Sequence, residues 1–388
     1  NAYVKSGNTD KGLALYNSLI TEYSESPFIS KALLSQGLVF YNKNENEKAL
    51  TKFKKIAGEY PASQEANQAV ATARLIYIDL GRVEDYATWI QTLDYVEVTD
   101  GDLDNATYQS AEKQYLDGNT NQAIKLFNRY LNDFKSGLHA NQSHFYLAQL
   151  YFKKDLKENA KAHYKAVVEA SQSEYTEEAL LRLSQITLEQ KNWAEAIPTL
   201  KRLEAEANFP QNSLFAQSNI MQAKYQLKDF VDAVIYAEKV LGNPNLDNKV
   251  KSDAYVIIAR SAMQTNDEAK AKSAYANVEQ TATGETAAEA LYYNAYFKNK
   301  EGSFVASNTV VQRIVKEYSG YKLYAAKSLI VMAKNQYALK DAFQATYILE
   351  SVIKNFKDFP DIVAEAQTEL NTIKTEQAKT NASIETED

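Results

Sequence analysis

The chain has 388 residues, of which 45% are hydrophobic and 24% charged, a composition typical of a folded globular protein. Its 43 basic and 50 acidic residues give a formal net charge of −7, so the average field of the molecule repels a nucleic-acid backbone. It has no cysteine, which excludes disulfides, thiolate nucleophiles and cysteine-ligated metals, and no apolar run approaches the roughly 18 residues of a membrane-spanning helix.

Helices joined by polar turns are predicted from the beginning of the chain, and residues 37–61, GLVFYNKNENEKALTKFKKIAGEYP, show the pattern most clearly. In the second helix of this stretch, Ala49, Phe53 and Ile56 are spaced by four and three residues, so they lie on one helical face. A single hairpin of this size cannot bury such a face, and the pattern therefore predicts neighbouring hairpins.

The same triplet recurs along most of the chain at intervals of 35–39 residues. Its leading residues are Gly12, Ala49, Tyr86, Ala123, Ala160, Ala196, Ala233, Ala271, Ala306 and Ala345. In the ninth copy the triplet is Ala306, Val310 and Arg313. A fixed period in this range predicts a stack of one repeated helical hairpin.

The helix before each triplet has a pattern of its own. Twelve residues before the leading residue, several repeats carry a small residue, such as Gly37 or Ala148, and an aromatic residue such as Phe40 or Tyr151 follows three residues later. Small residues let two helices approach closely, and the aromatic rings are expected to fill the gaps between hairpins.

Together these residues resemble the tetratricopeptide repeat (TPR). In the unit that starts at Ser30, the family's characteristic positions are occupied by Gly37, Phe40, Ala49, Phe53 and Pro61. The resemblance extends over about residues 1–357, with a period of about 37 residues instead of the family's ~34. It implies an all-α fold, a right-handed superhelical solenoid of about ten TPR-like hairpins plus a C-terminal capping helix. The third and ninth units depart most from the pattern.

Five segments are predicted along the chain. Residues 1–94 form N-terminal units, the first of them truncated because so little chain precedes Gly12, and we expect the chain to begin inside a longer array. Residues 95–104, YVEVTDGDLD, connect these units to the main array at 105–357. A capping helix with a polar outer face is predicted over residues 358–378, from the spacing of Val363, Ala366, Leu370 and Ile373, and residues 379–388 are predicted to be a disordered tail.

The acidic stretch DGDLDNATYQSAE, residues 100–112, has two interpretations. Asp100, Asp102 and Asp104 match the first three ligand positions of an EF-hand calcium loop, but Asn105 replaces the required glycine and Ala111 the bidentate glutamate. Alternatively, the stretch is an acidic turn in which Asp104 or Asn105 caps the start of a helix.

Sequence motifs for other chemistry are missing. No glycine-rich phosphate-binding motif occurs, and His139, His144 and His163 fit hairpin packing better than a zinc site, which needs three or four ligands in a cluster. We therefore predict no catalytic residue, no metal and no cofactor.

In the TPR family, the first helix of each unit lines a concave face that binds peptides. Carrying the family's positions over to this chain predicts a binding face made of Tyr146, Gln149, Arg182, Gln185, Phe215, Asn219, Gln222, Arg260 and Tyr292. Lys334 and Tyr337 hold corresponding positions in the tenth unit. Amide side chains can hydrogen-bond an extended peptide, and Tyr and Arg are frequent binding hot spots. The family's clamp for a C-terminal carboxylate has no complete counterpart.

The predicted function is a non-catalytic scaffold that binds a protein or an extended peptide. The unit endings Glu-Tyr-Pro and Glu-Tyr-Ser, at residues 59–61, 22–24 and 317–319, resemble bacterial envelope TPR proteins of the outer-membrane assembly lipoprotein and cell-division coordinator types. This resemblance and the absent cysteine favour a periplasmic or outer-membrane-associated protein. The alternatives are a cytoplasmic TPR adaptor and a hydrolase built on an α/α array, which would need a cavity with two or more acidic residues of raised pKa.

Overall fold

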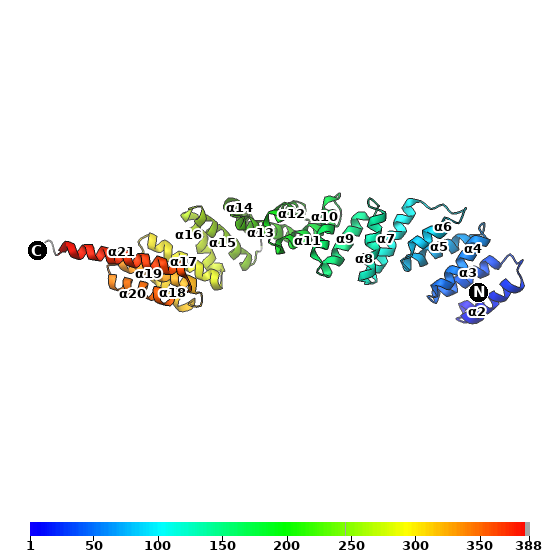
Figure 1. The fold of residues 1–388 in the computed structure, drawn as a ribbon, viewed down its shortest axis with the longest axis horizontal. Coiled ribbons are helices and arrows are strands. Elements are labelled where there is room, and N and C mark those ends of the chain that lie inside the picture. Colours follow the sequence, from blue (N-terminus) through cyan, green and yellow to red (C-terminus); the bar gives the residue numbers. More distant parts are fainter. Residues whose placement is uncertain (245, 385–388) are drawn as a thin grey trace. The chain divides into compact units, whose positions relative to one another are not determined.

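The computed structural model describes residues 1–244 and 246–384, and in these residues 21 α-helices and no β-strand are found (Figure 1). Two compact units make up the chain, Asn1–Ile186 and Thr187–Asp388. The helices of the first unit are α1 (Ala2–Lys5), α2 (Thr9–Glu22), α3 (Ile29–Asn42), α4 (Asn46–Glu59), α5 (Gln64–Asp79), α6 (Val83–Ile90), α7 (Asp100–Leu116), α8 (Thr120–Asp133), α9 (Ala140–Lys153) and α10 (Lys157–Glu169). The boundary between the units falls inside α11 (Thr176–Glu189).

The second unit continues with α12 (Trp193–Glu206), α13 (Pro210–Gln226), α14 (Phe230–Leu241), α15 (Asn248–Gln264), α16 (Glu268–Thr281), α17 (Gly284–Lys300), α18 (Phe304–Glu317), α19 (Lys322–Ala338), α20 (Ala342–Asn355) and α21 (Pro360–Ile384). None of the described helices is long and apolar enough to span a membrane.

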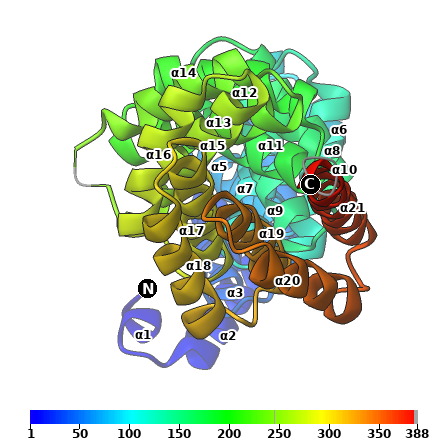
Figure 2. The same ribbon diagram turned by 90° about the vertical axis from the view of Figure 1, so that its left-hand side faces the viewer.

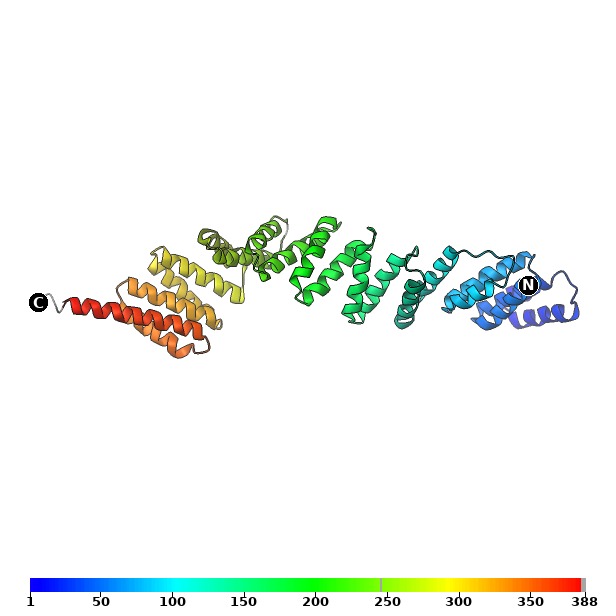
Figure 3. The same cartoon turned by 45° about the horizontal axis from the view of Figure 1, so that its top comes forward.

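Within each unit, helices that follow one another in the chain pack side by side as hairpins (Figures 1 and 3). Odd-numbered helices are the first helices of the hairpins and even-numbered helices are the second. First helices also contact the first helices of the next hairpin, as α3 contacts α5 and α17 contacts α19. Figure 2 shows α17, α18, α19 and α20 side by side, in agreement with their contacts. The prediction of about ten hairpins in an all-α array is confirmed.

The buried small residues are those that the period predicts. Ala49, Ala123, Ala160, Ala196, Ala233, Ala271 and Ala345 are all fully buried. In the first unit, Ala160 of α10 lies in a cluster with Ala148 of α9, the other helix of its hairpin, and with Ala179 of α11, the first helix of the next hairpin. Neighbouring hairpins therefore bury each other's apolar faces, as expected for a repeat array.

The ninth triplet has a different register from the predicted one. Ser307, Val311 and Ile314 are fully buried, whereas Ala306 is exposed. Ser307 Oγ donates a hydrogen bond of 2.8 Å to the backbone oxygen of Ala295, which satisfies the buried hydroxyl. The prediction of Ala306 was wrong because it followed the alanine, while the structure uses the neighbouring serine as the small residue.

Each hairpin turn contains one residue with positive φ, five positions before the buried leading residue. These residues are Gly7, Asn44, Gly81, Gly118, Asp155, Lys191, Lys228, Asn266, Gly302 and Lys340. A backbone hydrogen bond of about the same length closes the turn in each copy. In the second hairpin it runs from the amide of Glu45 to the oxygen of Phe40, at 2.9 Å. Gly302 lies five positions before Ser307, which independently supports the corrected register.

Residues 100–104 begin a helix and do not form a calcium loop. Thr99 is the N-cap of α7: Thr99 Oγ1 accepts from the Asp102 amide at 3.2 Å, and the Asp102 carboxylate accepts from the Thr99 amide at 3.0 Å. The Thr99 hydroxyl, which donates to Asp102 Oδ2 at 2.7 Å, and the Thr99 amide hold the pKa of Asp102 below its usual range. Asp104 is buried and accepts from Tyr130 Oη at 2.5 Å and from the Leu138 amide at 2.9 Å.

The connecting segment is therefore displaced from the predicted one. It covers residues 91–99, between α6 and α7, and not 95–104. Both sides of it belong to the first compact unit. The expected caps Asp104 and Asn105 lie inside α7 instead.

The C-terminal helix packs against α19 and α20 as the expected cap. Ile362, Ala366, Leu370 and Ile373 are its buried residues. The helix is longer than predicted: α21 runs to Ile384, so residues 379–384, predicted as part of a disordered tail, are helical. The rest of that predicted tail, residues 385–388, lies outside the described residues.

Candidate binding faces

The predicted residues of the first unit meet on the first helices α7, α9 and α11. The ring of Tyr146 on α9 stacks on Tyr115 of α7, with centroids 4.5 Å apart and planes inclined by 22°. Tyr115 Oη donates to Gln149 Oε1 at 2.8 Å, and Gln142 Nε2 donates to Tyr146 Oη at 3.2 Å. Burial raises the pKa of Tyr115, so its hydroxyl stays a donor at neutral pH. The result is a half-buried ladder of rings and amides across neighbouring repeats.

Arg182 and Gln185 extend this ladder onto α11. Arg182 Nη1 donates to Gln185 Oε1 at 3.1 Å, and Arg182 Nε lies 3.6 Å from Glu178 Oε1. The guanidinium lies 5.3 Å from the ring centroid of Phe152 on α9. Because the Arg182 side chain is 36% exposed, its positive charge is accessible at this surface. The four predicted residues of the first unit therefore lie on one continuous surface.

In the second unit, Phe215, Asn219 and Gln222 are spaced by four and three residues on α13 and are half-buried. Asn219 Nδ2 donates to the backbone oxygen of Phe215 at 2.8 Å. The amide group of Asn219 is thus held against its own helix, with its donor directed at the backbone.

Arg260 on α15 forms a bidentate ion pair with Glu289 on α17. Arg260 Nε lies 2.9 Å from Glu289 Oε1, and Arg260 Nη2 lies 2.5 Å from Glu289 Oε2. The hydroxyls of Tyr275 and Tyr324 also donate to this carboxylate, at 2.8 and 3.0 Å. Burial alone would raise the pKa of Glu289, but these donors, led by Arg260, outweigh it and lower the pKa. Glu289 therefore stays ionised and fixes the orientation of Arg260.

Glu289 was missed in the sequence because of the register error in the ninth unit. Position two of the TPR unit is one of the family's binding positions. If Ala306 is the leading residue of the ninth unit, this position is Ala288; if Ser307 is the leading residue, it is Glu289. The glycine of the hairpin turn, Gly302, was a signal that could have corrected the register.

Tyr292 on α17 is part of an aromatic cluster. Its ring centroid lies 4.9 Å from that of Tyr293 and 6.2 Å from that of Tyr324. The amine of Lys327 lies 5.6 Å from the Tyr292 ring. Burial raises the pKa of Tyr292, so its hydroxyl is neutral. Tyr292 and Arg260 are thus joined through Tyr324, which contacts both Tyr292 and the carboxylate that holds Arg260.

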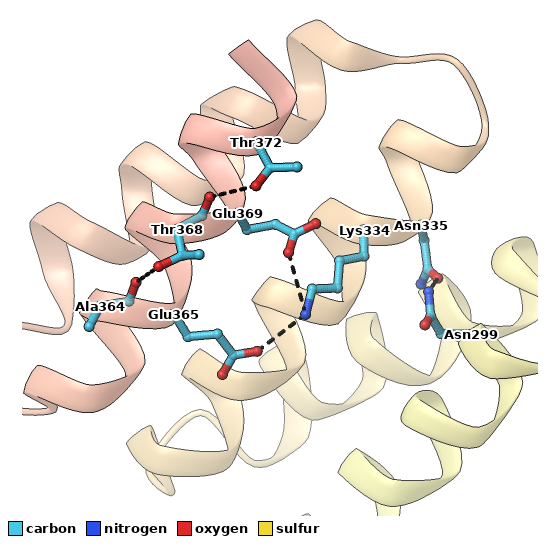
Figure 4. A network of polar contacts seen from close by, with 8 residues as sticks. All are labelled: Asn299, Lys334, Asn335, Ala364, Glu365, Thr368, Glu369 and Thr372. Atoms are coloured by element: carbon cyan, nitrogen blue, oxygen red, sulfur yellow. Dashed lines mark hydrogen bonds and ion pairs between the residues drawn. The ribbon is translucent and has the colours of Figure 1, made fainter. Parts of the chain in front are cut away.

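The capping helix covers the corresponding positions of the tenth hairpin (Figure 4). Lys334 Nζ lies 3.2 Å from Glu365 Oε1 and 3.6 Å from Glu369 Oε2 of α21. Tyr337 Oη donates to Glu376 Oε2 at 2.7 Å. Lys334 and Tyr337, predicted from the sequence to line the binding face, instead hold the cap.

The described residues contain no group of three or more His, Asp or Glu side chains placed to hold a metal ion. His144 and His163 do lie together, with their Nδ1 atoms 2.8 Å apart. Burial lowers the pKa of both, and lowers that of His163 to about 4 with a smaller contribution from His144. The pair is therefore neutral at physiological pH and belongs to the packing between α9 and α10.

Comparison with known families matches two stretches of the chain. Residues 90–218 match a tetratricopeptide repeat-like domain, and residues 1–64 match a tetratricopeptide repeat. No curated protein matches the chain.

Solved structures of TPR proteins are similar at low sequence identity. Yeast Tom70 is 12% identical, with 97% of this chain and 94% of that chain covered and a TM-score of 0.35. PilF of Pseudomonas aeruginosa is 17% identical, with 69% and 97% covered and a TM-score of 0.32. A TPR repeat-containing protein of Cytophaga hutchinsonii is 15% identical, with 64% and 95% covered and a TM-score of 0.34.

Proposed function

We propose that this chain, whose repeats are of the tetratricopeptide type, is a non-catalytic scaffold that holds an extended peptide segment of a partner protein. The peptide lies on the exposed edges of the first helices, where the ring and amide ladder of α7, α9 and α11 is continued by the positive charge of Arg182. This ladder is the observation that carries the proposal.

The chemistry of the ladder suits a peptide backbone. Tyr146 and Gln149 can exchange their present hydrogen bonds, with Gln142 and Tyr115 respectively, for bonds to backbone amides and carbonyls. Tyrosine rings supply large, rigid contact surface at low entropic cost, and arginine is a frequent hot spot. In the second unit, Arg260 is pre-oriented by Glu289, so little side-chain entropy is lost when it contacts a carbonyl or carboxylate.

The test starts from capture of partners on the immobilised chain from a native-host lysate, followed by mass spectrometry and by synthesis of the bound segments as peptides. The triple variant Tyr146→Ala, Gln149→Ala, Arg182→Ala is then compared with the wild type by fluorescence anisotropy. We expect at least a tenfold weaker Kd, about 1.4 kcal/mol or more.

The matched control removes the same kinds of side chain elsewhere: Tyr23→Ala, Lys55→Ala and Asn132→Ala, all exposed positions away from the first-helix edges. This control should bind as the wild type does. Equal binding by the wild type and the first triple variant would place the peptide on another surface and overturn the proposal.

We further propose that the scaffold acts in the assembly of a bacterial envelope complex. This setting is supported by the Glu-Tyr-Pro and Glu-Tyr-Ser unit endings and by the absence of cysteine. Fractionation of native-host cells with an antibody to the chain tests it. Recovery with the periplasm or outer membrane is expected, and recovery with the cytoplasm would favour the adaptor alternative.

A further inference from the structure

The second helices of the second unit expose apolar side chains at two equivalent positions, two residues before and two residues after the buried leading residue. On α14 these are Val231 and Ile235, which are 65% and 53% exposed. Val305 on α18 is 69% exposed, and Phe343 and Tyr347 on α20 are 81% and 63% exposed. Large apolar side chains with such exposure, repeated at equivalent positions of a folded protein, mark a candidate interaction surface.

The two remaining second helices of this unit carry small uncharged residues at the same positions. They are Ala194 and Pro198 on α12 and Ala269 and Ser273 on α16, all exposed. With these residues, the positions define a stripe without any charge across α12, α14, α16, α18 and α20, which we name the second-helix stripe.

The first unit differs from the second at these positions. Two residues before the leading residue, it carries Asp10, Glu47, Glu84 and Glu158, so four of its five second helices place an acidic side chain there. Like charges facing each other are unfavourable, so this part of the first unit is unsuited to self-pairing. The absence of charge is therefore particular to the second unit and does not follow from the repeat.

Side chains next to the stripe neutralise one another within the chain. Ion pairs link successive second helices: Lys239 with Glu204 at 2.5 Å, Lys270 with Glu238 at 2.9 Å, and Arg313 with Glu279 at 3.2 Å. A partner on the stripe thus meets an apolar surface bordered by compensated charges. Such a border fits a partner with the same uncharged and internally paired surface, which a second copy of the chain supplies.

The sizes of the side chains are complementary about α16. In an antiparallel pairing of two stripes, the small residues of α12 lie opposite Phe343 and Tyr347 of α20. Val231 and Ile235 of α14 then lie opposite the exposed Val305 and Thr309 of α18. The small residues of α16 lie in the centre of the stripe and would face those of the second copy. This is the pattern that an isologous two-fold contact requires, because residue i then meets residue j and j meets i.

We propose that the second-helix stripe is the contact surface of a symmetric homodimer whose two-fold axis passes near α16. Fully burying an aromatic side chain removes about 150–250 Å², so Phe343 and Tyr347 alone offer on the order of 200–300 Å². With the other exposed stripe residues and their flanks, the surface approaches the roughly 800 Å² per partner of a standard interface.

The absence of native cysteine gives a direct test. Ser273→Cys lies near the proposed axis, so two copies should form an intermolecular disulfide rapidly under a mild oxidant. Thr51→Cys is the matched control, because it is exposed at the equivalent position of α4 in the first unit. We expect at least tenfold faster crosslinking of Ser273→Cys than of Thr51→Cys at the same protein concentration.

A second measurement distinguishes crosslinking within a stable dimer from crosslinking by random collision. Sedimentation velocity of the wild type over 1–200 μM should show a monomer–dimer equilibrium, and Ile235→Glu with Phe343→Glu should shift it to monomer with an unchanged circular dichroism spectrum. A wild type that stays monomeric throughout, or a dimer that persists in the double variant, would overturn the proposal. Equal crosslinking rates of the two cysteine variants would do so as well.

Discussion

Gly37 is the residue at which the close packing of a hairpin is most demanding. A Cβ atom at this position would lie 2.4 Å from Cε1 of Phe53, a distance that real Cβ contacts do not reach. Phe53 is fully buried, so its ring has little room to move away. In this repeat, the close contact with the Phe53 ring therefore requires a small residue twelve positions before the leading residue.

We predict that Gly37→Ala lowers the free energy of unfolding by about 1–3 kcal/mol, because the methyl group overpacks the contact with Phe53. Gly58→Ala is the matched control on α4, since a Cβ there meets nothing within 4 Å. That variant should gain up to about 1 kcal/mol from helix propensity. Urea unfolding of both variants checks this, and equal stability of Gly37→Ala and wild type would contradict the steric account.

The positive-φ turns give a second prediction with the opposite sign. Lys340 adopts φ of 70° at a position where Gly7, Gly81, Gly118 and Gly302 occur in other hairpins. Because a side chain disfavours this region, Lys340→Gly should stabilise the protein by about 1 kcal/mol, and Gly118→Ala should destabilise it by a similar amount. Thermal melts of the two variants are expected to shift in opposite directions, and shifts of the same sign would argue against the turn assignment.

The histidine pair predicts how stability depends on pH. The folded-state pKa of His163 is lowered to about 4, whereas the unfolded value is 6.5. The unfolded chain therefore binds more protons between these values, and stability is present above about pH 6.5 and lost as pH falls toward about 4. Between pH 7 and pH 4.5 the wild type should lose on the order of 2 kcal/mol more than His163→Phe. Urea unfolding at the two pH values measures this, and equal losses would contradict the prediction.

At the scale of the helices, the sequence predicts well which residues are buried. It predicts poorly which side chains of different helices bond to one another. Ala49, Ala160 and Ala271 are fully buried as predicted, because a periodic apolar face is a local property of the chain. The ion pair of Glu289 with Arg260 and the contacts of α21 with Lys334 could not be predicted from this periodicity. Both depend on which side chains from other repeats come within bonding distance, and Glu289 was further hidden by a one-residue register error.

The capping helix illustrates how an array ends. The face of α21 with Thr368, Asn371 and Thr375 is exposed, and the hydroxyls of Thr368 and Thr375 donate to their own helix, to the oxygens of Ala364 and Asn371 at 2.8 Å each. Close to them, Thr372 repeats the same bond (Figure 4). These hydroxyls are satisfied without a further helix, so the face offers a following hairpin little to pack against.

We predict that Thr368→Leu with Thr375→Leu causes self-association beyond that of the wild type, because the two leucines recreate an apolar face at the end of the array. Thr51→Leu with Lys55→Leu places two exposed leucines, four residues apart, on α4 inside the array, and should associate less. Light scattering at increasing concentration makes the comparison. Equal association of both variants would mean that exposed leucines on α21 promote self-association no more than exposed leucines inside the array, and would contradict the prediction.

At the scale of the whole molecule, the account predicts stability that is local. In a repeat array each hairpin contacts only its neighbours, so a defect in one hairpin should not be felt several repeats away. The sequence indicates this organisation through its period. It does not indicate the two compact units, whose boundary inside α11 has no signal in composition or in turn residues.

Native-state hydrogen exchange of the wild type and Ala160→Leu tests this central claim most directly. Leucine at this fully buried position overpacks the fifth hairpin. The account predicts loss of amide protection in α9 and α10 and in their neighbours α8 and α11, with protection in α15 to α20 unchanged. A uniform loss of protection over all helices would show one cooperative core and contradict a stack of hairpins that stabilise each other pairwise.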